Sequence, residues 1–499
     1  MLGGPLPGSW RRSFWLIAAL VALLATLAPT AHGADDEVPP AEDNPPGCTT
    51  ATQESEEQCG AQGRAGFNAD THIPPIDACN NITSPAGSLV TRILPQGPRR
   101  PDGSAAFVSG ACVYLPPGYA TSGLRYPVVY LLHGGGGDQG DWVTQGSLQQ
   151  TLDEAAVADP AHAVIAVTPD GRSGQWFDYY DGSFQLETYM LRYLIPYVDR
   201  HFNTIADRRG RVIDGLSNGG YGALHFAAKA PDLFVAAGSM SGNVGARTMS
   251  GLGTPIGGTG QQAQEAGAYY YGNIPISLVP NLDPVDLTID WGATCSSDVT
   301  VDLCATYAFE QSFRLDNQAF RNELDAQGHQ NYEYRETEGA HAWRWWSMWL
   351  RERHLPFFFD RLSPPEPLTD LFVRSETPVS FRYRSIAAHF SVWGYDIAAD
   401  RPVREFLDLT NVTAEGLNVR GTGGVTITTA ARYLPGQTYR IAGTGLDDTT
   451  VVADAAGRLT LAVDLGPAHQ VEQYSPEARV QEAAGTYTFV ERTVSISLA

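Results

Sequence analysis

One serine lies in a pattern that can turn its hydroxyl into a nucleophile. Residues 215–219 read Gly-Leu-Ser-Asn-Gly, a G-x-S-x-G pattern with Ser217 at its centre. A serine hydroxyl attacks poorly unless a base lies beside it, so the residue must be presented on a sharp turn. Flanking glycines relieve the crowded backbone of such a turn. An apolar strand at 212–213 leads into the pattern and a helix over 220–229 follows it, which predicts nucleophilic chemistry at Ser217.

A histidine that could serve as the base is expected late in the chain. Triads on a strand–turn–helix frame follow the order serine, acid, histidine. His341 lies in Gly339-Ala-His-Ala-Trp343, in a loop directly after an expected strand at 332–337. The carboxyl end of the last strand is where the base must lie, so we expect His341 to fill this role. Other histidines after Ser217 fall on helices, beside helix ends or in the C-terminal region: His225, His329, His354, His389 and His469.

An acidic side chain should hold the imidazole in the right tautomer and stabilise its positive charge. The candidates considered lie in or after an expected strand at 287–291 and before His341: Asp290, Asp298, Asp302, Glu310 and Asp316. Glu310 opens the helix that leads to the last strand and is the favoured candidate. Asp298 is the alternative acid.

A reaction through a tetrahedral intermediate also needs two donors where negative charge develops. The backbone N–H of Asn218, directly after the candidate nucleophile, is one expected donor. The second should come from His133-Gly-Gly-Gly-Gly137, where the absence of side chains lets a substrate approach the backbone, and we favour the N–H of Gly135. A phosphate-binding loop is excluded here, because no Gly-Lys-Ser/Thr follows the glycines.

The segments that must position these residues alternate between strand and helix over 85–362. Apolar runs typical of buried parallel strands occur at 126–133, 163–168, 211–214, 234–238 and 287–291. Apolar residues recur every three to four positions at 186–198 and 309–324, as in amphipathic helices. This alternation predicts an α/β domain with a mainly parallel sheet.

A different pattern begins after a proline-rich linker at 363–367. Short segments over 368–499 alternate apolar and polar residues and are separated by glycine-containing turns, which predicts a β-sandwich domain. Two roles are open for this domain: it binds a polysaccharide or the cell envelope, with Trp393, Tyr395 and Tyr433 as candidate platforms, or it only stabilises the enzyme.

The N-terminus indicates export. Arg11 and Arg12 precede an apolar stretch at 14–27 that is shorter than the ~20 residues of a membrane span, and small residues precede a cleavage point after Gly33. We therefore expect a signal peptide at 1–33, a secreted protein with no stable membrane span once the signal is removed, and an irregular segment at 34–84. Six cysteines fit an exported chain, and proximity favours the disulfides Cys48–Cys59, Cys79–Cys112 and Cys295–Cys304.

Composition excludes several classes of partner. The formal net charge is −22, which argues against nucleic acid and anionic membranes. No C-x-x-C or His–Cys cluster occurs, so no metal and no other cofactor are expected. Lys229 is the only lysine, and together with abundant glycine and alanine this is typical of a GC-rich bacterium such as an actinobacterium.

Four motifs together resemble a known family. Leu131-Leu-His-Gly-Gly-Gly-Gly with Trp142, Pro169-Asp-Gly171, the 215–224 segment and Gly339-Ala-His-Ala-Trp343 look like the putative esterase family. That family includes the esterase D type, feruloyl esterases and the antigen 85 mycolyltransferases. The resemblance covers about 85–362 and implies an α/β-hydrolase fold and acyl-ester chemistry. It also favours Glu310, because Phe309-Glu-Gln-Ser-Phe313 is similar to the segment that carries the catalytic glutamate of the mycolyltransferases.

The chain departs from the mycolyltransferases at residues 133–136, where they have Asp-Gly-Leu-Arg and use the Asp and Arg to bind trehalose. The resemblance therefore does not extend to trehalose. Trp142, Trp176 and Trp343 are candidates to line the substrate cleft, and a place in the apolar core is the alternative for each. The expected function is a secreted serine esterase acting on an ester that is carbohydrate-linked or part of the cell envelope. Two alternatives remain: an acyltransferase that moves the acyl group to a sugar or another alcohol, and a non-enzymatic envelope or carbohydrate-binding protein.

Overall fold

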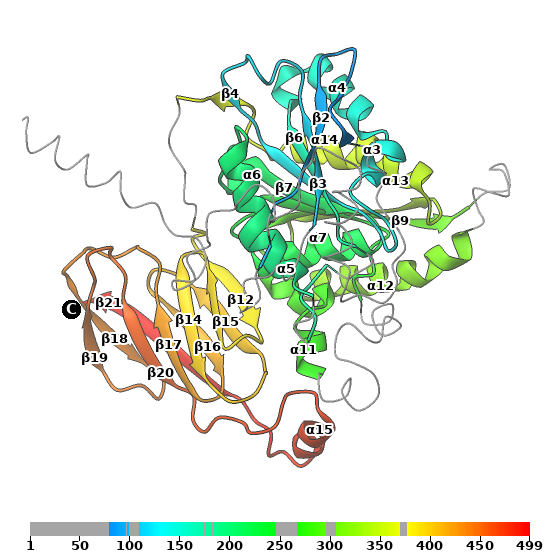
Figure 1. Cartoon of the computed structure of the whole chain (residues 1–499). Coiled ribbons are helices and arrows are strands. Elements are labelled where there is room, and N and C mark those ends of the chain that lie inside the picture. Colours follow the sequence, from blue (N-terminus) through cyan, green and yellow to red (C-terminus); the bar gives the residue numbers. More distant parts are fainter. Residues whose placement is uncertain are drawn as a thin grey trace, which may run out of the picture.

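A computed structural model describes residues 79–95, 97–98, 109–172, 176–180, 184–245, 267–295, 306–369 and 377–499. The expected signal peptide, Cys48, Cys59, Asp298, Asp302 and Cys304 lie outside these ranges. Figure 1 shows an α/β region followed by a region of antiparallel strands. Within the described residues, no helix combines the length and the apolar character needed to cross a membrane.

The α/β region is built on one large sheet. In spatial order its strands are β1 (Ile82–Thr83), β2 (Leu89–Ile93), β3 (Ala111–Leu115), β6 (Ile165–Pro169), β5 (Val128–Leu132), β7 (Arg211–Gly215), β8 (Ala236–Met240), β9 (Asp286–Thr294) and β10 (Tyr332–Glu338). β6, β5, β7, β8, β9 and β10 run parallel to one another. β3 pairs antiparallel with β6, and β2 and β1 extend this antiparallel edge. Each apolar run predicted from the sequence overlaps one of these strands, with bounds that differ by up to three residues at either end. The parallel sheet with its crossover helices confirms the predicted α/β-hydrolase fold.

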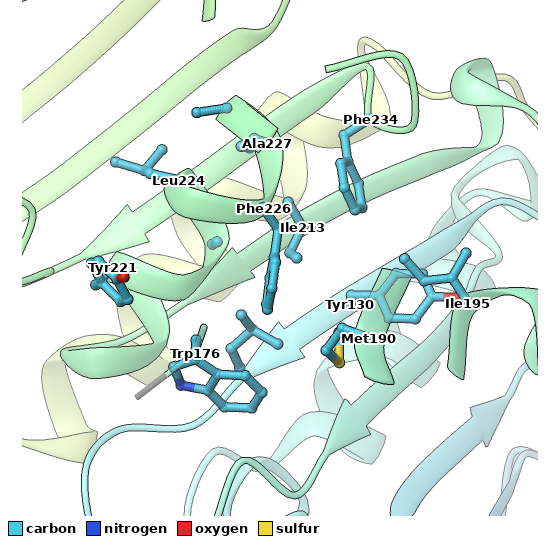
Figure 2. Packing of buried hydrophobic residues seen from close by; sticks show 14 of the residues in the cluster. Tyr130, Trp176, Met190, Ile195, Ile213, Tyr221, Leu224, Phe226, Ala227 and Phe234 are labelled. Carbon is cyan, nitrogen blue, oxygen red and sulfur yellow. The ribbon is translucent and has the colours of Figure 1, made fainter. Parts of the chain in front are cut away.

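Two apolar cores cover the two faces of this sheet, because side chains alternate along each strand. Along β5, Val128 and Tyr130 point into one core, while Val129 and Leu131 point into the other. The first core packs under α5 (Leu186–Thr188), η3 (Tyr189–Leu194), α6 (Ile195–His201), α7 (Asn218–Lys229), α11 (Gly267–Tyr271), η5 (Pro275–Leu282) and α12 (Tyr307–Ala326). Figure 2 shows part of this core, where aromatic side chains lie between α7 and the sheet.

The second core packs under α3 (Asp141–Thr144), α4 (Leu148–Ala158), α13 (Trp343–Trp349), η7 (Leu350–His354) and α14 (Leu355–Phe359). Single turns η2 (Pro160–His162) and η4 (Arg208–Gly210) lead toward β6 and β7. The disulfide Cys79–Cys112 ties the start of the described chain to β3, as sequence proximity predicts. This bridge lies beside the second core, so it fastens the antiparallel edge of the sheet.

The C-terminal region is a sandwich of two antiparallel sheets. One sheet has the order β12 (Phe381–Ser385), β15 (Leu407–Val412), β16 (Gly416–Gly421), β21 (Val490–Leu498), β18 (Thr438–Gly443) and β19 (Thr449–Val452). The other has β13 (His389–Val392), β14 (Tyr395–Asp400), β17 (Gly424–Thr428) and β20 (Thr460–Asp464), and α15 (Pro476–Ala483) lies outside both. A single core draws side chains from both sheets, including Leu409 and Ile427.

The sandwich core also contains the three aromatic residues expected to be binding platforms. Trp393, Tyr395 and Tyr433 are all buried. The inward faces of the two sheets need large apolar side chains to fill the space between them, and these residues supply them. The expectation that these three rings form a surface for carbohydrate is therefore wrong.

The predicted linker at 363–367 is held against the α/β region. Glu366 and Pro367 form the short strand β11 (Glu366–Pro367), which pairs antiparallel with β4 (Leu124–Arg125). The backbone N–H of Ser363 donates to the carbonyl of Arg209 at 2.9 Å. The proline-rich sequence marks where the pattern changes, but the segment is packed rather than a free tether.

Candidate active site

Ser217 lies at the sharp turn between β7 and α7. Its backbone has φ +53° and ψ −121°, a conformation that costs free energy in a residue with a side chain. The backbone N–H of Ser217 donates to the carbonyl of Met240 at 2.8 Å, and Gly219 N–H donates to Leu216 at 2.7 Å. These bonds from the end of β8 and within the turn hold the hydroxyl at the carboxyl edge of the sheet.

The two outer glycines of the G-x-S-x-G pattern are required by close backbone approach. A Cβ on Gly215 would lie 2.3 Å from the carbonyl oxygen of Gly219. A Cβ on Gly219 would lie 2.2 Å from the carbonyl oxygen of Leu132, at the end of β5. Both separations are far below van der Waals contact, so the helix can start this close to the sheet only where side chains are absent.

His341 faces the serine from the loop between β10 and α13. Its Nε2 lies 2.9 Å from Ser217 Oγ, and its Nδ1 lies 2.8 Å from Glu310 Oε2. A carboxylate only accepts, so Nδ1 carries the proton and Nε2 is left to accept the serine hydroxyl. The ring stacks on Phe313 at 4.4 Å between centroids and meets the edge of Trp346 at 4.9 Å, which fixes its orientation.

Glu310 is completely buried in the first turn of α12, where the helix N-terminus favours a negative charge. Its Oε1 accepts two hydrogen bonds at 2.8 Å, from the hydroxyl of Ser241 and from the backbone N–H of Gly292. Trp346 Nε1 in turn donates to Ser241 Oγ at 3.2 Å. The buried carboxylate is therefore satisfied on one oxygen and free to face His341 with the other.

The other carboxylates considered for the acid lie elsewhere or are not described. Asp298 and Asp302 fall outside the described residues. Asp290 is buried beneath the site, where its side chain is hydrogen-bonded by His354 and Arg353. Asp316 lies on α12 beside Gly245. Among the described carboxylates, Glu310 is the one in contact with His341.

The glycine-rich loop runs beside the serine turn, as expected for an oxyanion site. A Cβ on Gly134 would lie 3.2 Å from Ser217 Cβ, and one on Gly135 would lie 2.9 Å from Asn218 Nδ2. Asn218 is the first residue of α7, so its backbone N–H has no partner within the helix. Gly135 and Asn218 thus both border the space in front of the Ser217 hydroxyl.

His133 holds this loop in place. Its Nδ1 donates to the carbonyl of Gly134 at 2.7 Å, and its Nε2 accepts from the backbone N–H of Gly171 at 2.8 Å. Trp176 Nε1 donates to the carbonyl of His133 at 3.2 Å, and the two rings meet edge to face at 5.1 Å. The Pro169-Asp-Gly171 motif and Trp176 therefore act together on the glycine loop.

Two of the three tryptophans expected in the cleft are core residues instead. Trp142 and Trp176 have no solvent exposure. Gly171 and Gly222 pack directly on the Trp176 ring, and Trp142 packs edge to face on Trp343 at 5.1 Å. Trp343 itself borders the cavity in front of Ser217. The surrounding helices bury Trp142 and Trp176, so the expectation that these two rings contact substrate is wrong.

A cavity of about 810 Å³ opens in front of the serine. Apolar side chains line much of it: Leu216, Phe309, Phe313, Leu315, Trp343 and Trp346. Asp141, Gln145, Asn218, Asn243 and Ser312 add polar groups. Within the described ranges, the structure holds no group of three or more His, Cys, Asp or Glu side chains that could bind a metal.

Ser241, Gly292 and Trp346 were not identified from the sequence as part of this site. Ser241 follows β8 directly, and Gly292 lies near the end of β9. Because the carboxyl ends of neighbouring parallel strands meet at one edge, residues at these positions should converge on Ser217. The position of Ser241 directly after a predicted strand is the feature of the sequence that could have marked it as a candidate hydrogen-bond donor at the site.

A buried charged network lies under the site. His354 Nδ1 lies 2.8 Å from Asp214 Oδ2 and its Nε2 lies 3.1 Å from Asp290 Oδ2. Burial acts to lower the pKa of His354, but the two carboxylates outweigh it and raise the pKa to about 9. Asp290 also accepts the backbone N–H of Ser241 with its own carbonyl, at 2.8 Å. The network therefore connects the strand that precedes Ser217 to the residue that supports Glu310.

Comparison with known proteins finds similarity over part of the chain. The family model described as putative esterase matches residues 109–357. An esterase of Mycobacterium tuberculosis is 39% identical over 149 residues, which are 29% of this chain and 31% of that protein. An endo-1,4-beta-xylanase/feruloyl esterase of Xylanibacter ruminicola is 32% identical over 146 residues, 28% of this chain and 20% of that protein. The matches to these two relatives thus span less than a third of their length.

Among solved structures, a ferulic acid esterase matches with 22% identity and a TM-score of 0.43, covering 55% of this chain and 99% of that one. The segment with the family match contains the serine turn, the glycine loop and His341, and it ends within α14. Over residues 109–357, this chain belongs to the putative esterase family.

Proposed function

We propose that this protein is a serine carboxylic-ester hydrolase that works through an acyl-enzyme on Ser217. The observation that carries the proposal is the continuous contact from Ser217 Oγ to His341 Nε2, and from His341 Nδ1 to the buried Glu310. The family match over 109–357 supports the same chemistry.

In this mechanism Ser217 Oγ attacks the ester carbonyl carbon and its proton passes to His341 Nε2. Glu310 keeps the imidazole in the accepting tautomer and stabilises the positive charge that develops. The carbonyl oxygen becomes an oxyanion, and the backbone N–H groups of Gly135 and Asn218 donate to it. His341 then protonates the departing alcohol, which leaves the acyl group on Ser217. Water, activated by His341, attacks the acyl carbon and releases the acid.

The second candidate is transfer of the acyl group to an alcohol other than water. The polar side chains of Asp141, Gln145 and Asn243 in the same cavity favour it, because they could bind the hydroxyl groups of an acceptor. Both reactions use one acyl-enzyme, so the products separate them. A new ester formed when a sugar or simple alcohol is added would assign transfer, and free acid alone would assign hydrolysis.

We also propose that the protein is exported. The N-terminal sequence has the features of a signal peptide, and the Cys79–Cys112 disulfide suits an oxidising compartment.

Reaction with a fluorophosphonate probe and a panel of short p-nitrophenyl, feruloyl, acetyl-sugar and long-chain esters tests the function. The wild type should be labelled and should hydrolyse at least one ester, and Ser217→Ala should be folded, unlabelled and near background. Glu310→Gln should lower kcat by on the order of 10³- to 10⁴-fold. Glu323→Gln, the same change farther along α12, should leave kcat unchanged. Full activity of Ser217→Ala would refute the proposal. Loss of activity in Asp298→Asn, with activity retained in Glu310→Gln, would refute the assignment of Glu310 as the acid of the triad.

A further inference from the structure

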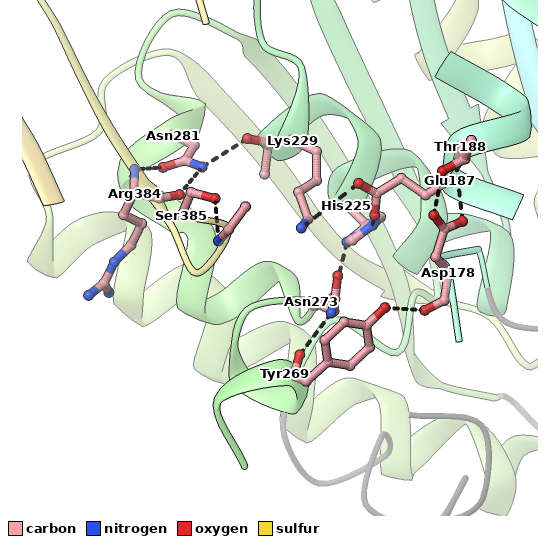
Figure 3. Close-up of polar contacts among 12 residues, drawn as sticks. Asp178, Glu187, Thr188, His225, Lys229, Tyr269, Asn273, Asn281, Arg384 and Ser385 are labelled. Atoms are coloured by element: carbon pink, nitrogen blue, oxygen red, sulfur yellow. Dashed lines mark hydrogen bonds and ion pairs between the residues drawn. The ribbon is translucent and has the colours of Figure 1, made fainter. Parts of the chain in front are cut away.

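A second cavity lies between the α/β region and the sandwich. Its volume is about 200 Å³, and it shares no lining residue with the cavity at Ser217. Glu187, Thr188 and Lys229 border it from the α/β side, and Ser385 borders it from β12, as can be followed in Figure 3. Drug-sized ligands occupy cavities of roughly 300–1,000 Å³, so this interdomain cavity suits a single small ring.

Positive charge dominates this interdomain cavity, although the whole chain carries a net charge of −22. Lys229 and Arg192 both line it, with Glu187 as the one carboxylate in the lining. One oxygen of Glu187 lies 2.7 Å from His225 Nε2, and the other lies 3.9 Å from Lys229 Nζ. His225 thus holds one oxygen of the carboxylate, and the long distance from the other oxygen to Lys229 leaves that ammonium able to donate elsewhere.

The pKa of Glu187 is lowered by the positive charges around it. Burial acts to raise this pKa, but Lys229, His225 and Arg192 outweigh it and lower the value to about 2. Within the described part of the chain, Arg192 forms no ion pair within 4 Å. Its exposed guanidinium at the cavity wall therefore has its donors available for an incoming anion.

The sandwich contributes groups suited to a hydroxylated ring. Ser385 is buried, and its hydroxyl accepts the backbone N–H of Ala387 at 3.1 Å, which leaves the hydroxyl proton to be donated. Phe390 is half-buried and packs at 5.4 Å from the Tyr383 ring, so it gives the cavity an apolar wall. The Ser391 hydroxyl donates to Asp396 Oδ2 at 2.8 Å, so its oxygen is left to accept a hydrogen bond from a ligand. Cations, hydroxyl groups and an aromatic face occur together here.

We propose that the interdomain cavity binds a sugar acid: its carboxylate pairs with Lys229 and Arg192, its hydroxyl groups bond Ser385 and Ser391, and its ring packs on Phe390. The size of the cavity accepts one ring, either a free monosaccharide or one uronic acid residue of a polysaccharide. The binding is independent of ester cleavage and does not require Ser217.

Titration calorimetry of the full chain with D-glucuronate, and with D-glucose as the neutral probe, tests this site. Glucuronate should bind saturably to the wild type and to Ser217→Ala, and glucose should bind at least about tenfold more weakly, because it lacks the charge-assisted bonds. Arg192→Gln should weaken glucuronate binding by about tenfold or more. Arg200→Gln, an exposed arginine on the neighbouring α6, is the matched control and should bind as the wild type.

A galacturonate trimer identifies the source of the sugar acid. Tighter binding of the trimer would assign a polysaccharide residue, and tighter binding of the monosaccharide would assign the free acid. Unchanged affinity in Arg192→Gln, equal binding of glucose, or the absence of saturable binding would overturn the proposal. Equal competition by inorganic phosphate would also overturn it, because the site would then recognise charge without a sugar ring.

Discussion

The hydroxyl of Ser241 donates to Glu310 Oε1 at 2.8 Å, on the carboxylate oxygen that does not face His341. Ser241 itself has φ +51° and is fixed by its backbone N–H to Asp290 and by Trp346 Nε1. A strained residue held at three points indicates that its position is determined by the surrounding structure. Ser241 therefore limits the rotation of Glu310 and, through it, the orientation of the imidazole.

Ser241→Ala should lower kcat/KM for ester hydrolysis by about tenfold to a hundredfold. The variant removes one charge-assisted hydrogen bond to the carboxylate and leaves the indole N–H of Trp346 without its acceptor. Steady-state kinetics on the best ester of the substrate panel measures the loss, and circular dichroism checks that the fold is kept. Ser312→Ala is the control, because Ser312 borders the same cavity but donates to the Phe309 carbonyl. Equal losses in both variants would argue against a role for the Glu310 contact.

Trp176→Phe should lower kcat by about tenfold with little change in KM. The substitution keeps an aromatic ring in the core but removes the hydrogen bond to the His133 carbonyl that helps place the glycine loop. Interactions made only in the transition state affect kcat, whereas substrate contacts affect KM. Trp393→Phe, a conservative change inside the sandwich, should leave both constants unchanged. A rise in KM with kcat preserved would instead show that Trp176 contacts the substrate.

The buried His354 should make stability depend on pH above neutrality. Its folded-state pKa of about 9 lies above the ~6.5 of an unfolded histidine. A raised histidine pKa contributes stability that is fully present below about pH 6.5 and is lost as the pH rises through about 9. The free energy of unfolding should therefore fall by up to about 3 kcal/mol across this window.

Urea denaturation at a series of pH values from 6 to 9.5 measures this dependence. His354→Asn should be less stable at pH 6.5 and should lose most of the slope, since no proton is then taken up on folding. His162→Asn, at a partly exposed histidine beside Phe359, should keep the wild-type slope. A wild-type stability that is constant between pH 6.5 and 9 would show that His354 is neutral in the fold.

The sequence was a good guide wherever the signal is local or follows chain order. The apolar runs at β5 and β7 are continuous because both faces of a parallel sheet are buried. The serine turn can be recognised because the close backbone approach in such a turn requires glycines on both sides of the serine. Glu310 and His341 could be selected because topology fixes their order after Ser217, and the structure brings all three together.

The sequence was a poor guide where the answer depends on what packs above a residue. Trp176 is an aromatic residue of the kind that can line a cleft, but α7 covers it. Only the three-dimensional arrangement shows that Gly222 of α7 packs on its ring. The sandwich aromatic Trp393 was misassigned for the same reason. Ser241 was missed because its place directly after β8 marks it only as a strand-end residue, and its contact with Glu310 forms where β8, β9 and α12 converge in the fold.

The contact between the two regions gives a last prediction. Asn281 on η5 is buried, and its Nδ2 donates to the Ala228 carbonyl at the end of α7 at 2.9 Å and to the Arg384 carbonyl at 3.0 Å. Its Oδ1 accepts Arg384 N–H at 2.7 Å, as Figure 3 shows. Asn281→Ala should lower the free energy of unfolding by about 2–5 kcal/mol, because buried backbone groups lose their partners. Calorimetry should show one unfolding transition in the wild type, because Asn281 bonds both α7 and β12. The variant should unfold at a lower temperature. Asn322→Ala, at an exposed residue, is the control and should change the free energy of unfolding by less than about 0.5 kcal/mol. Equal changes in the two variants would show that Asn281 does not stabilise the contact between the two regions.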